Sequence, residues 1–300
     1  MKILSFGSCN IDYVYGLDHI VAVGETEHSH RMDIFPGGKG LNQSIAIARA
    51  GAKVYHAGCV GSDGDMLMDT LVSSGVDVSL IKRVDEKNGH AIIQVSAKGE
   101  NSIFIYAGSN GMMTEEFIDS VLSNFEKGDV IVLQNEINKL DYIIDRACDR
   151  GMCVVLNPSP IDEVIDRIDF SKISYVVLNE IEAEHISKNG EPRAFIEYMA
   201  KNYPELKIVL TLGDKGCMYH DSENDAYHPA FSVDVVDTTA AGDTFMGYFV
   251  ASIGSEMPYA DILERASAAS AIAVSRLGAS ASIPTAAEVD AALEELKKKI

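Results

Sequence analysis

The sequence predicts a doubly wound α/β fold, in which a mostly parallel sheet is flanked by helices and carries a small β lid. Short runs rich in Val and Ile alternate with longer segments of helical period, as such a sheet requires. Two stretches depart from this rhythm and show β patterns instead. At 300 residues and 47% hydrophobic content, the chain is long and apolar enough to bury a large core.

Four apolar runs indicate buried strands of the sheet: Val130–Leu133, Val154–Leu156, Tyr175–Leu178 and Ile208–Leu212. A helix is expected between the first two, from Leu140 to Arg150, and Gly151 is a typical residue just past a helix end. The last helix is expected to begin at a capping box formed by Thr285 and Glu288.

The two β stretches, residues 11–35 and 90–106, are expected to form an antiparallel lid, the second turning at 98–101. No linker separates them from the rest, so we predict one domain over residues 1–300. His28 and His30 share a face if their segment is a strand. With no third ligand nearby, a solvated lid face is favoured over a metal pair.

Charge and cysteine content exclude several classes of protein. With 25 basic against 45 acidic residues, the surface repels nucleic acid and anionic membranes. The five cysteines form no C-x-x-C motif, which argues against a disulfide framework or structural zinc. Because we also find no signal peptide and no apolar run long enough to cross a bilayer, we expect a cytoplasmic protein.

The segment Asp237–Phe245 precedes a helical pattern from about Thr244 to Ile253. Three small residues, Ala240, Ala241 and Gly242, would let amide N–H groups at the helix start approach a phosphate. Asp243 beside them could take a proton from an attacking hydroxyl during phosphoryl transfer. An ordinary helix N-cap remains the alternative.

A diglycine segment, Pro36–Asn42, opens another helical pattern. It is not a P-loop, because Asp33 stands at the first glycine position and Gly40 where Ser or Thr should bind magnesium. Lys39 and Asn42 instead supply hydrogen-bond donors to a polar ligand. A plain loop before a helix is the alternative.

Polar residues follow several strands, where ligand-binding loops of open α/β sheets lie. After the first strand, Asp12 offers two acceptor oxygens that suit adjacent sugar hydroxyls, and Asn10 can donate and accept. An Asx-turn is the simpler explanation of either residue alone. Further strand ends carry similar groups: 134–136, 157–160, 179–182 and 211–216.

These motifs resemble those of the ribokinase (PfkB-type) carbohydrate kinase family, in the family's order and over nearly the whole chain. The most specific are Gly37-Gly38-Lys39-Gly40-x-Asn42 and Asp237-Thr-x-Ala-Ala-Gly-Asp243. The stretches 99–103 and 107–110 resemble the family's ribose-phosphorylating members.

The resemblance implies ATP-dependent phosphorylation of a primary hydroxyl of a small sugar, with ribose the first choice. It implies Asp243 as the base and the amides of Ala240–Asp243 as an anion hole. The residues implied to hold the sugar are Asn10, Asp12, Gly38, Lys39, Asn42, Glu136 and Asp243. Those implied to hold the adenine nucleotide are Asn179, Thr211, Leu212, Gly213, Asp214, Lys215, Gly216 and Gly242.

Two ions and a partner follow from the same resemblance. Glu182, in the N-x-x-E motif with Asn179, is implied to bind Mg²⁺ through water. A monovalent cation, K⁺ by expectation, is implied at Asp237, Thr239, Ala273, Arg276, Gly278 and Ser282, mostly through backbone carbonyls. Family members pair through their lids, so we expect a homodimer.

Departures from the family pattern leave the sugar open. Asn88 stands where a threonine is common, and His90 follows near the expected far side of the sugar. A nucleoside, a deoxysugar or a ketose is therefore an alternative substrate. A nucleoside base would need an aromatic wall, which Tyr13, Tyr15, Phe35, Phe104 and Tyr106 could supply.

Two functions from other classes are weaker. A non-catalytic sugar-binding regulator would have no chemical need for Asp243. A dehydrogenase lacks its fingerprint, since no G-x-G-x-x-G follows the first strand.

Overall fold

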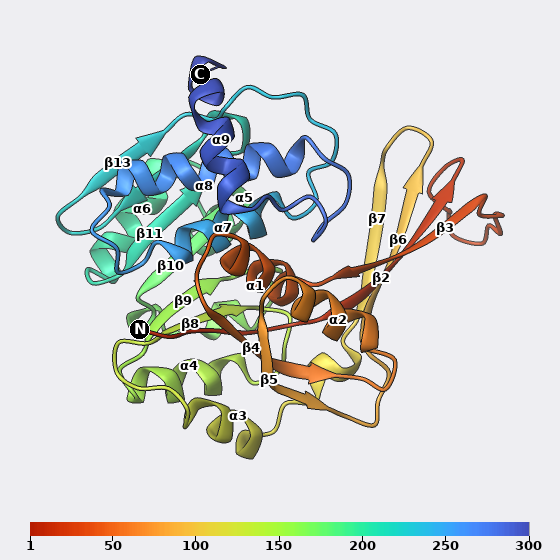
Figure 1. Ribbon diagram of the computed structural model, residues 1–300, viewed down its shortest axis with the longest axis horizontal. Helices are drawn as coiled ribbons and strands as arrows, with labels where there is room; N and C mark the ends of the chain where they lie inside the picture. Colours follow the sequence, from red (N-terminus) through yellow and green to blue (C-terminus); the bar gives the residue numbers. More distant parts are fainter. Residues whose placement is uncertain (300) are drawn as a thin grey trace.

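The computed structural model describes residues 1–299 and contains a nine-stranded sheet in the order β13-β12-β11-β10-β9-β8-β1-β4-β5 (Figure 1). Its strands are β1 Ile3–Phe6, β4 Val54–Val60, β5 Asp77–Arg83, β8 Val130–Gln134, β9 Cys153–Asn157, β10 Tyr175–Asn179, β11 Lys207–Thr211, β12 Cys217–His220 and β13 Asp225–His228. All pairs from β5 to β11 are parallel, and β12 and β13 add an antiparallel edge. The predicted fold class and its four buried strands are confirmed.

Helices cover both faces of this sheet. One face is covered by α1 Lys39–Arg49, α2 Asp65–Ser73, α7 Ala241–Ala251, α8 Tyr259–Val274 and α9 Ala286–Leu296. The other is covered by α3 Glu115–Leu122, α4 Leu140–Asp149, α5 Glu180–Ser187 and α6 Pro192–Asn202. Short 3₁₀ turns are η1 Gly108–Gly111, η2 Ile165–Arg167, η3 Phe170–Lys172, η4 Gly213–Lys215 and η5 Lys297–Lys299.

Each sheet face has its own apolar core, because side chains of a buried strand alternate between the two faces. In β8, Val130 and Val132 point into the core under α1 and α7, and Ile131 and Leu133 into the core under α3 and α4. The predicted capping box of α9 is present.

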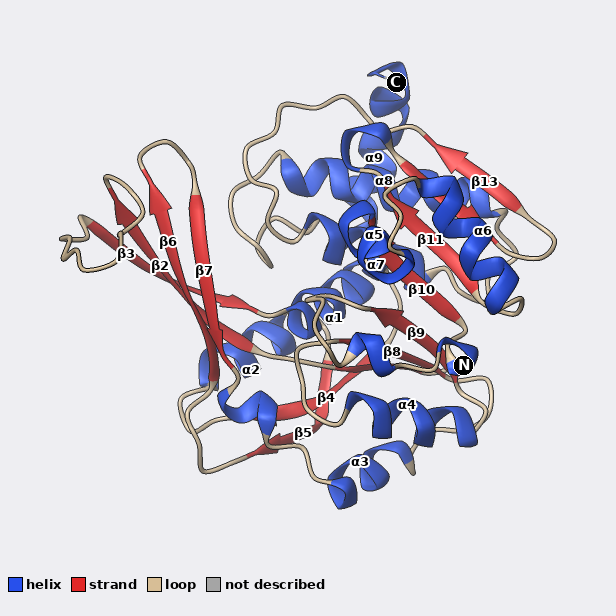
Figure 2. Cartoon of the chain, turned by 180° about the vertical axis from the view of Figure 1, so that it is seen from behind, coloured by secondary structure: helices blue, strands red, loops and turns tan. Residues whose placement is uncertain are grey.

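A second sheet of four strands forms the lid and projects from the body (Figure 2). Its order is β3-β2-β6-β7, with β2 Asn10–Leu17, β3 Arg31–Gly37, β6 Gly89–Ser96 and β7 Asn101–Tyr106. The prediction of an antiparallel lid is wrong for the central pair, since β2 and β6 are parallel. Both strands follow parallel strands of the main sheet, β1 and β5, and therefore leave its edge in the same direction.

The strand order reverses at β1, which pairs with β4 on one side and β8 on the other. Connections leave such a pair of strands in opposite directions, and a crevice forms beyond their carboxyl ends. No helix in residues 1–299 has both the length and the apolar character required to span a membrane.

Candidate active site

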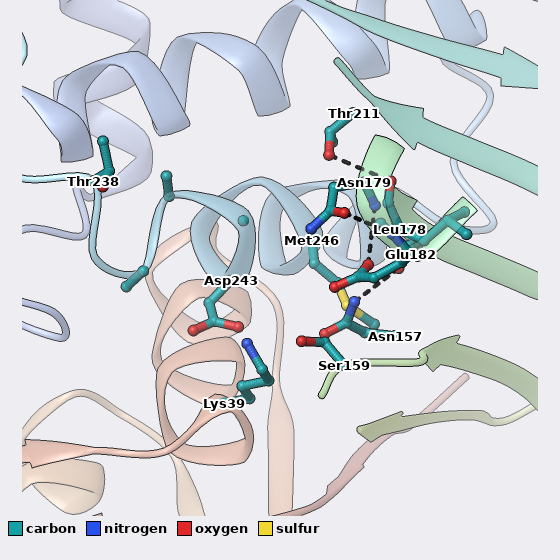
Figure 3. Close-up of a pocket in the computed structure, with 14 residues that line it drawn as sticks. Lys39, Asn157, Ser159, Leu178, Asn179, Glu182, Thr211, Thr238, Asp243 and Met246 are labelled. Carbon is teal, nitrogen blue, oxygen red and sulfur yellow. Dashed lines mark hydrogen bonds between the residues drawn. The ribbon is translucent and has the colours of Figure 1, made fainter. Parts of the chain in front are cut away.

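A cavity of about 240 Å³ lies at the carboxyl ends of the central strands (Figure 3). It is bordered by the start of α1, the start of α7 and the ends of β9, β10 and β11. The lining residues are Lys39, Asn157, Ser159, Val177, Leu178, Asn179, Glu182, Thr211, Thr238, Ala240, Ala241, Gly242, Asp243 and Met246.

The start of α7 presents amide groups to this cavity. The helix begins at Ala241, three residues earlier than predicted, after Ala240 in the left-handed region at φ 60°. Among the described residues, the N–H groups of Ala240, Gly242 and Asp243 have no hydrogen-bond acceptor. The Ala241 amide, which the resemblance also implies as part of the anion hole, instead donates to the Thr238 carbonyl at 3.2 Å.

Asp243 lies in the first turn of α7 and is only 8% exposed. Asn42 Nδ2 donates to its Oδ2 at 3.1 Å, and Gln43 Nε2 donates to its Oδ1 at 2.9 Å. Each carboxylate oxygen therefore keeps acceptor capacity for a further hydrogen. The Asn42 Oδ1 atom is buried without a partner in the described part of the chain, so a ligand donor could satisfy it.

Lys39 and Glu136 form a charged group beside Asp243. The Lys39 ammonium points toward the Asp243 carboxylate (Figure 3), and the Lys39 amide donates to Glu136 Oε2 at 3.0 Å. Burial alone would lower the pKa of Lys39, but the carboxylates of Asp243, Glu136 and Glu182 raise it above its ordinary value. Ser8 Oγ donates to the same Glu136 oxygen and so joins the strand ends of β1 and β8.

Asp12 and Asn10 extend the site along β2. Burial, followed by the nearby Glu136 carboxylate, raises the pKa of Asp12 to about 7. Asn10 is held from the other side, because Asn110 Nδ2 donates to Asn10 Oδ1 at 2.7 Å. Gly38, at φ 91°, lies close to β2, since a Cβ there would be 3.0 Å from the Asn10 backbone nitrogen.

Strand register divides the lid into two faces, since paired residues share a face. Asp12 pairs with Phe35 on β3 and with Ala91 on β6, and Ala91 pairs with Ile105 on β7. We call this face, with Asp12, Phe35, Ala91 and Ile105, the Asp12 face. Of the five rings that could form a wall for a nucleoside base, Phe35 lies on the Asp12 face, whereas Tyr13, Tyr15, Phe104 and Tyr106 lie on the opposite face.

The two departures from the family motifs, Asn88 and His90, have different surroundings. His90 pairs with Ile11, on the face opposite Asp12, and its ring packs against Tyr13 and Tyr106 at centroid distances of 5.9 and 5.2 Å. His90 therefore does not share the lid face of Asp12. Asn88 is buried, and its side chain bonds to backbone at Cys9, Gly61 and Gly89.

The N-x-x-E motif forms a capping box at the start of α5. Asn179 Oδ1 accepts from the Glu182 amide at 3.0 Å, and Glu182 Oε2 accepts from the Asn179 amide at 3.0 Å. The motif thus has a structural role, and Glu182 still borders the cavity.

Thr211, at the end of β11, also lines the cavity, whereas residues 212–216 lie just outside the lining. Gly216, at φ 107°, approaches the His228 carbonyl so closely that a Cβ would lie 2.0 Å from its oxygen. The side chain of Lys215 forms an ion pair with Glu180 at 3.2 Å.

The six residues expected around a monovalent cation lie in two segments joined by Asp237. Its carboxylate accepts from the Thr239 amide at 2.9 Å and from the Gly278 amide at 3.0 Å. Arg276 turns its guanidinium toward Glu288 at 2.8 Å. Ser282 Oγ donates to the Ala279 carbonyl, and the Ala273 carbonyl accepts from the Arg276 amide.

Sequence reasoning missed several residues that border Asp243 or the cavity. Gln43 follows Asn42 directly, but only the fold shows that it faces Asp243. Asn157 and Ser159 belong to a polar strand end and Thr238 to the Asp237–Asp243 motif, but the sequence assigns none of the three a role. Met246 has no sequence signal of its own.

The model of the pfkB family of carbohydrate kinases matches residues 1–286. The chain belongs to this family. It is therefore a sugar kinase, a phosphotransferase that uses an alcohol group as acceptor, as its motifs predicted.

Ribokinases are similar to this chain over nearly their full length. The ribokinase of Schizosaccharomyces pombe is 35% identical over 319 residues, covering 99% of both chains. The ribokinase of Haemophilus influenzae is 33% identical over 293 residues, covering 94% of this chain and 95% of the relative.

Solved structures that are similar to this chain include ribokinases and nucleoside kinases. The ribokinase of Cryptococcus neoformans var. grubii, in complex with ADP, is 33% identical with a TM-score of 0.85, covering 97% of this chain and 99% of the other. That of Arabidopsis thaliana, complexed with ribose and ATP, is 25% identical with a TM-score of 0.85, covering 98% of each.

Proposed function

We propose that the chain transfers the γ-phosphoryl group of ATP to the primary hydroxyl of D-ribose, giving ribose 5-phosphate and ADP. The observation that carries this proposal is the buried Asp243 carboxylate beside unpaired amides of Gly242 and Ala240. Similarity to ribokinases over nearly the whole chain supports ribose as the acceptor.

In the proposed mechanism, Asp243 takes the proton from the attacking hydroxyl as the phosphoryl group passes above the amides. The amides and the α7 dipole stabilise the negative charge on the transferring oxygens. Lys39 lies beside Asp243 and can contact the same phosphate. The lid, closing over the sugar, would exclude the water that otherwise hydrolyses ATP.

The sugar is proposed to lie between Asp243 and the Asp12 face, held by Asn10, Asp12, Gly38, Lys39, Asn42 and Glu136. The orphan oxygen of Asn42 and the acceptors of Asp12 suit neighbouring hydroxyls. The nucleotide is proposed along Asn179 and residues 211–216, with its phosphates at Gly242.

Two ions complete the proposal. Glu182 keeps one carboxylate oxygen free of the capping box, so it fits the outer shell of Mg²⁺, which would neutralise phosphate charge. Each carboxylate oxygen of Asp237 accepts a hydrogen bond from one backbone amide and keeps a lone pair, and this free acceptor capacity fits K⁺. Residues 237, 239, 273, 276, 278 and 282 would hold this ion, which would fix the loop that aims the amides of α7.

The arrangement of the Asp12 face favours a small sugar over a nucleoside. A base needs a broad aromatic surface, and of the five candidate rings only Phe35 shares that face. Ala91 and Ile105 beside Asp12 suit the apolar edge of a pentose.

We also propose a single-domain homodimer in the cytoplasm, joined through the lids. Ile103, on the Asp12 face, is 52% exposed, and a second lid would cover it. The five cysteines are free, which suits a reducing compartment.

The test is ADP release with ribose, deoxyribose, ketoses and nucleosides, each with Mg·ATP in K⁺ buffer. Turnover on ribose should exceed that on every other acceptor in kcat/KM. Strong turnover on a nucleoside with none on ribose would reject ribose, and no turnover on any acceptor would reject the catalytic function.

A further inference from the structure

Two glutamines lie behind the Asp243 carboxylate, on the side away from the cavity lining. Gln43, on α1, is 1% exposed, and Gln134, at the end of β8, is fully buried. Gln43 Nε2 donates to Asp243 Oδ1 at 2.9 Å, and Gln134 Nε2 donates to Gln43 Oε1 at 2.7 Å. The three side chains form a chain of hydrogen bonds from the sheet to the first turn of α7.

The donors and acceptors in this series of hydrogen bonds determine how the Gln43 side-chain amide is oriented. An amide side chain donates only from its nitrogen and accepts only at its oxygen. Because Gln134 donates to the oxygen of Gln43, the amino group of Gln43 is turned toward Asp243. A reversed Gln43 would place its oxygen against the carboxylate, and two acceptors repel each other.

Gln134 is buried, and one of its two polar side-chain atoms is unpaired among the described residues. The Oε1 atom of Gln134 has no hydrogen-bond partner among residues 1–299, so it does not anchor the side chain. It fits beside Gly7 because residue 7 has no side chain; a Cβ there would lie 2.1 Å from Gln134 Oε1. A buried amide that leaves one atom unpaired is costly, which suggests a role other than stability.

We propose that Gln43 and Gln134 are positioning residues for the base, a role that rests on the proposed function. Asn42 donates to Oδ2 of Asp243 and Gln43 donates to Oδ1, so both carboxylate oxygens are fixed and the group cannot rotate. The remaining lone pairs of the carboxylate then face the hydroxyl to be deprotonated. Gln134 acts only through Gln43. Both donors favour the ionised carboxylate, the form that accepts a proton.

The first experiment compares Gln43→Met with wild type. Methionine has similar length and no N–H donor, so kcat should fall about 10- to 100-fold while the dissociation constant of the sugar changes less than about threefold. The acid limb of the pH dependence of kcat should move to higher pH, because the ionised carboxylate has lost a donor. A residue that only packs the core would leave that limb in place.

A double-variant cycle tests whether the effect passes through the base. In an Asp243→Asn background, Gln43→Met should cause little further loss. Gln134→Met should reduce kcat less than Gln43→Met and add nothing to it. Equal losses in both backgrounds, or a wild-type kcat and pH profile for Gln43→Met, would overturn the proposal.

If Gln43→Met does not fold, Gln134→Met is measured by the same criteria, with wild-type kcat and pH profile again overturning the proposal. Failure of the proposed function gives a different result, since the wild-type protein would then turn over no sugar at all.

Discussion

Gly247 of α7 packs against Ala46 of α1 so closely that a Cβ on Gly247 would lie 2.2 Å from the Ala46 Cβ. Gly247 is one turn beyond Asp243, and Ala46 is one turn beyond Asn42, so this contact lies directly behind the hydrogen bonds between them. The separation of α1 and α7 therefore determines the hydrogen-bond distances between Asp243 and its donors on α1.

Gly247→Ala should push the helices apart. A helical Gly→Ala change normally stabilises, but overpacking here should lower the free energy of unfolding by about 1–3 kcal/mol and reduce kcat. Thermal unfolding and ADP release measure the two effects. Gly242→Ala is the control for stability, because a Cβ there meets no atom within 4 Å. A Gly247→Ala protein as stable and active as wild type would contradict the close contact.

Asp243→Asn should lower kcat about 10²-fold or more, with sugar binding nearly intact, because asparagine keeps the size but cannot take the proton. Steady-state ADP release and calorimetric titration of ribose separate the two quantities. Asp69→Asn, on the exposed surface of α2, serves as the matched control. Wild-type turnover by Asp243→Asn would remove this residue from the mechanism.

Sugar affinity should depend on pH near neutrality. Burial and Glu136 raise the pKa of Asp12 to about 7, so the acceptor form is lost as pH falls below that value. If only ionised Asp12 binds, the apparent KM for ribose should be about tenfold higher at pH 6 than at pH 8. Asp12→Asn should weaken binding and remove this dependence; a flat wild-type KM would contradict it.

The same shift has a consequence for stability. The pKa of Asp12 is higher in the folded state than in the unfolded state, so between about pH 4 and pH 7 the folded state binds more protons. The free energy of unfolding therefore decreases as the pH rises from about 4 to about 7. Asp12→Asn should therefore be more stable than wild type at pH 8, and the difference should vanish below pH 4. Denaturant unfolding at both pH values measures it.

Replacing K⁺ by tetramethylammonium should lower kcat and the thermal midpoint together. Saturating K⁺ is expected to stabilise the fold by roughly 1–3 kcal/mol, as any ligand of the native state does. In Asp237→Asn, K⁺ should change kcat and the thermal midpoint much less than in wild type. The substitution replaces one carboxylate oxygen of the proposed site by an NH₂ group, which cannot bind a cation. An unfolding curve identical with and without K⁺ would argue against an ion at Asp237.

The lid pairing makes its own prediction. Sedimentation velocity of the wild-type protein should give about twice the chain mass of 32.4 kDa. Ile103→Lys would bury a charge in the lid interface and should shift the protein to the monomer. A matched change on the opposite lid face, Phe104→Lys, should affect the dimer less, and equal effects would place the interface elsewhere.

Local patterns were enough to predict the fold class and much of the site. Buried strands such as Val130–Leu133 are apolar on both faces, and capping residues such as Thr285 mark helix ends whatever the rest of the chain does. Asp12 follows β1, at the edge where the ligand-binding loops of a parallel sheet lie. The motifs with Lys39 and Asp243 follow β3 and β13, which are not parallel strands of the main sheet, so only the resemblance to the family groups them with Asp12.

Tertiary structure alone decided which way side chains face and which amides are free. Strand register placed His90 and four aromatic rings on the face opposite Asp12, and a one-residue change of register would have reversed this. The contact between Gly247 and Ala46 brought Gln43 to Asp243 across 200 residues of sequence. Such relationships depend on distances between distant segments, and local composition carries no information about them.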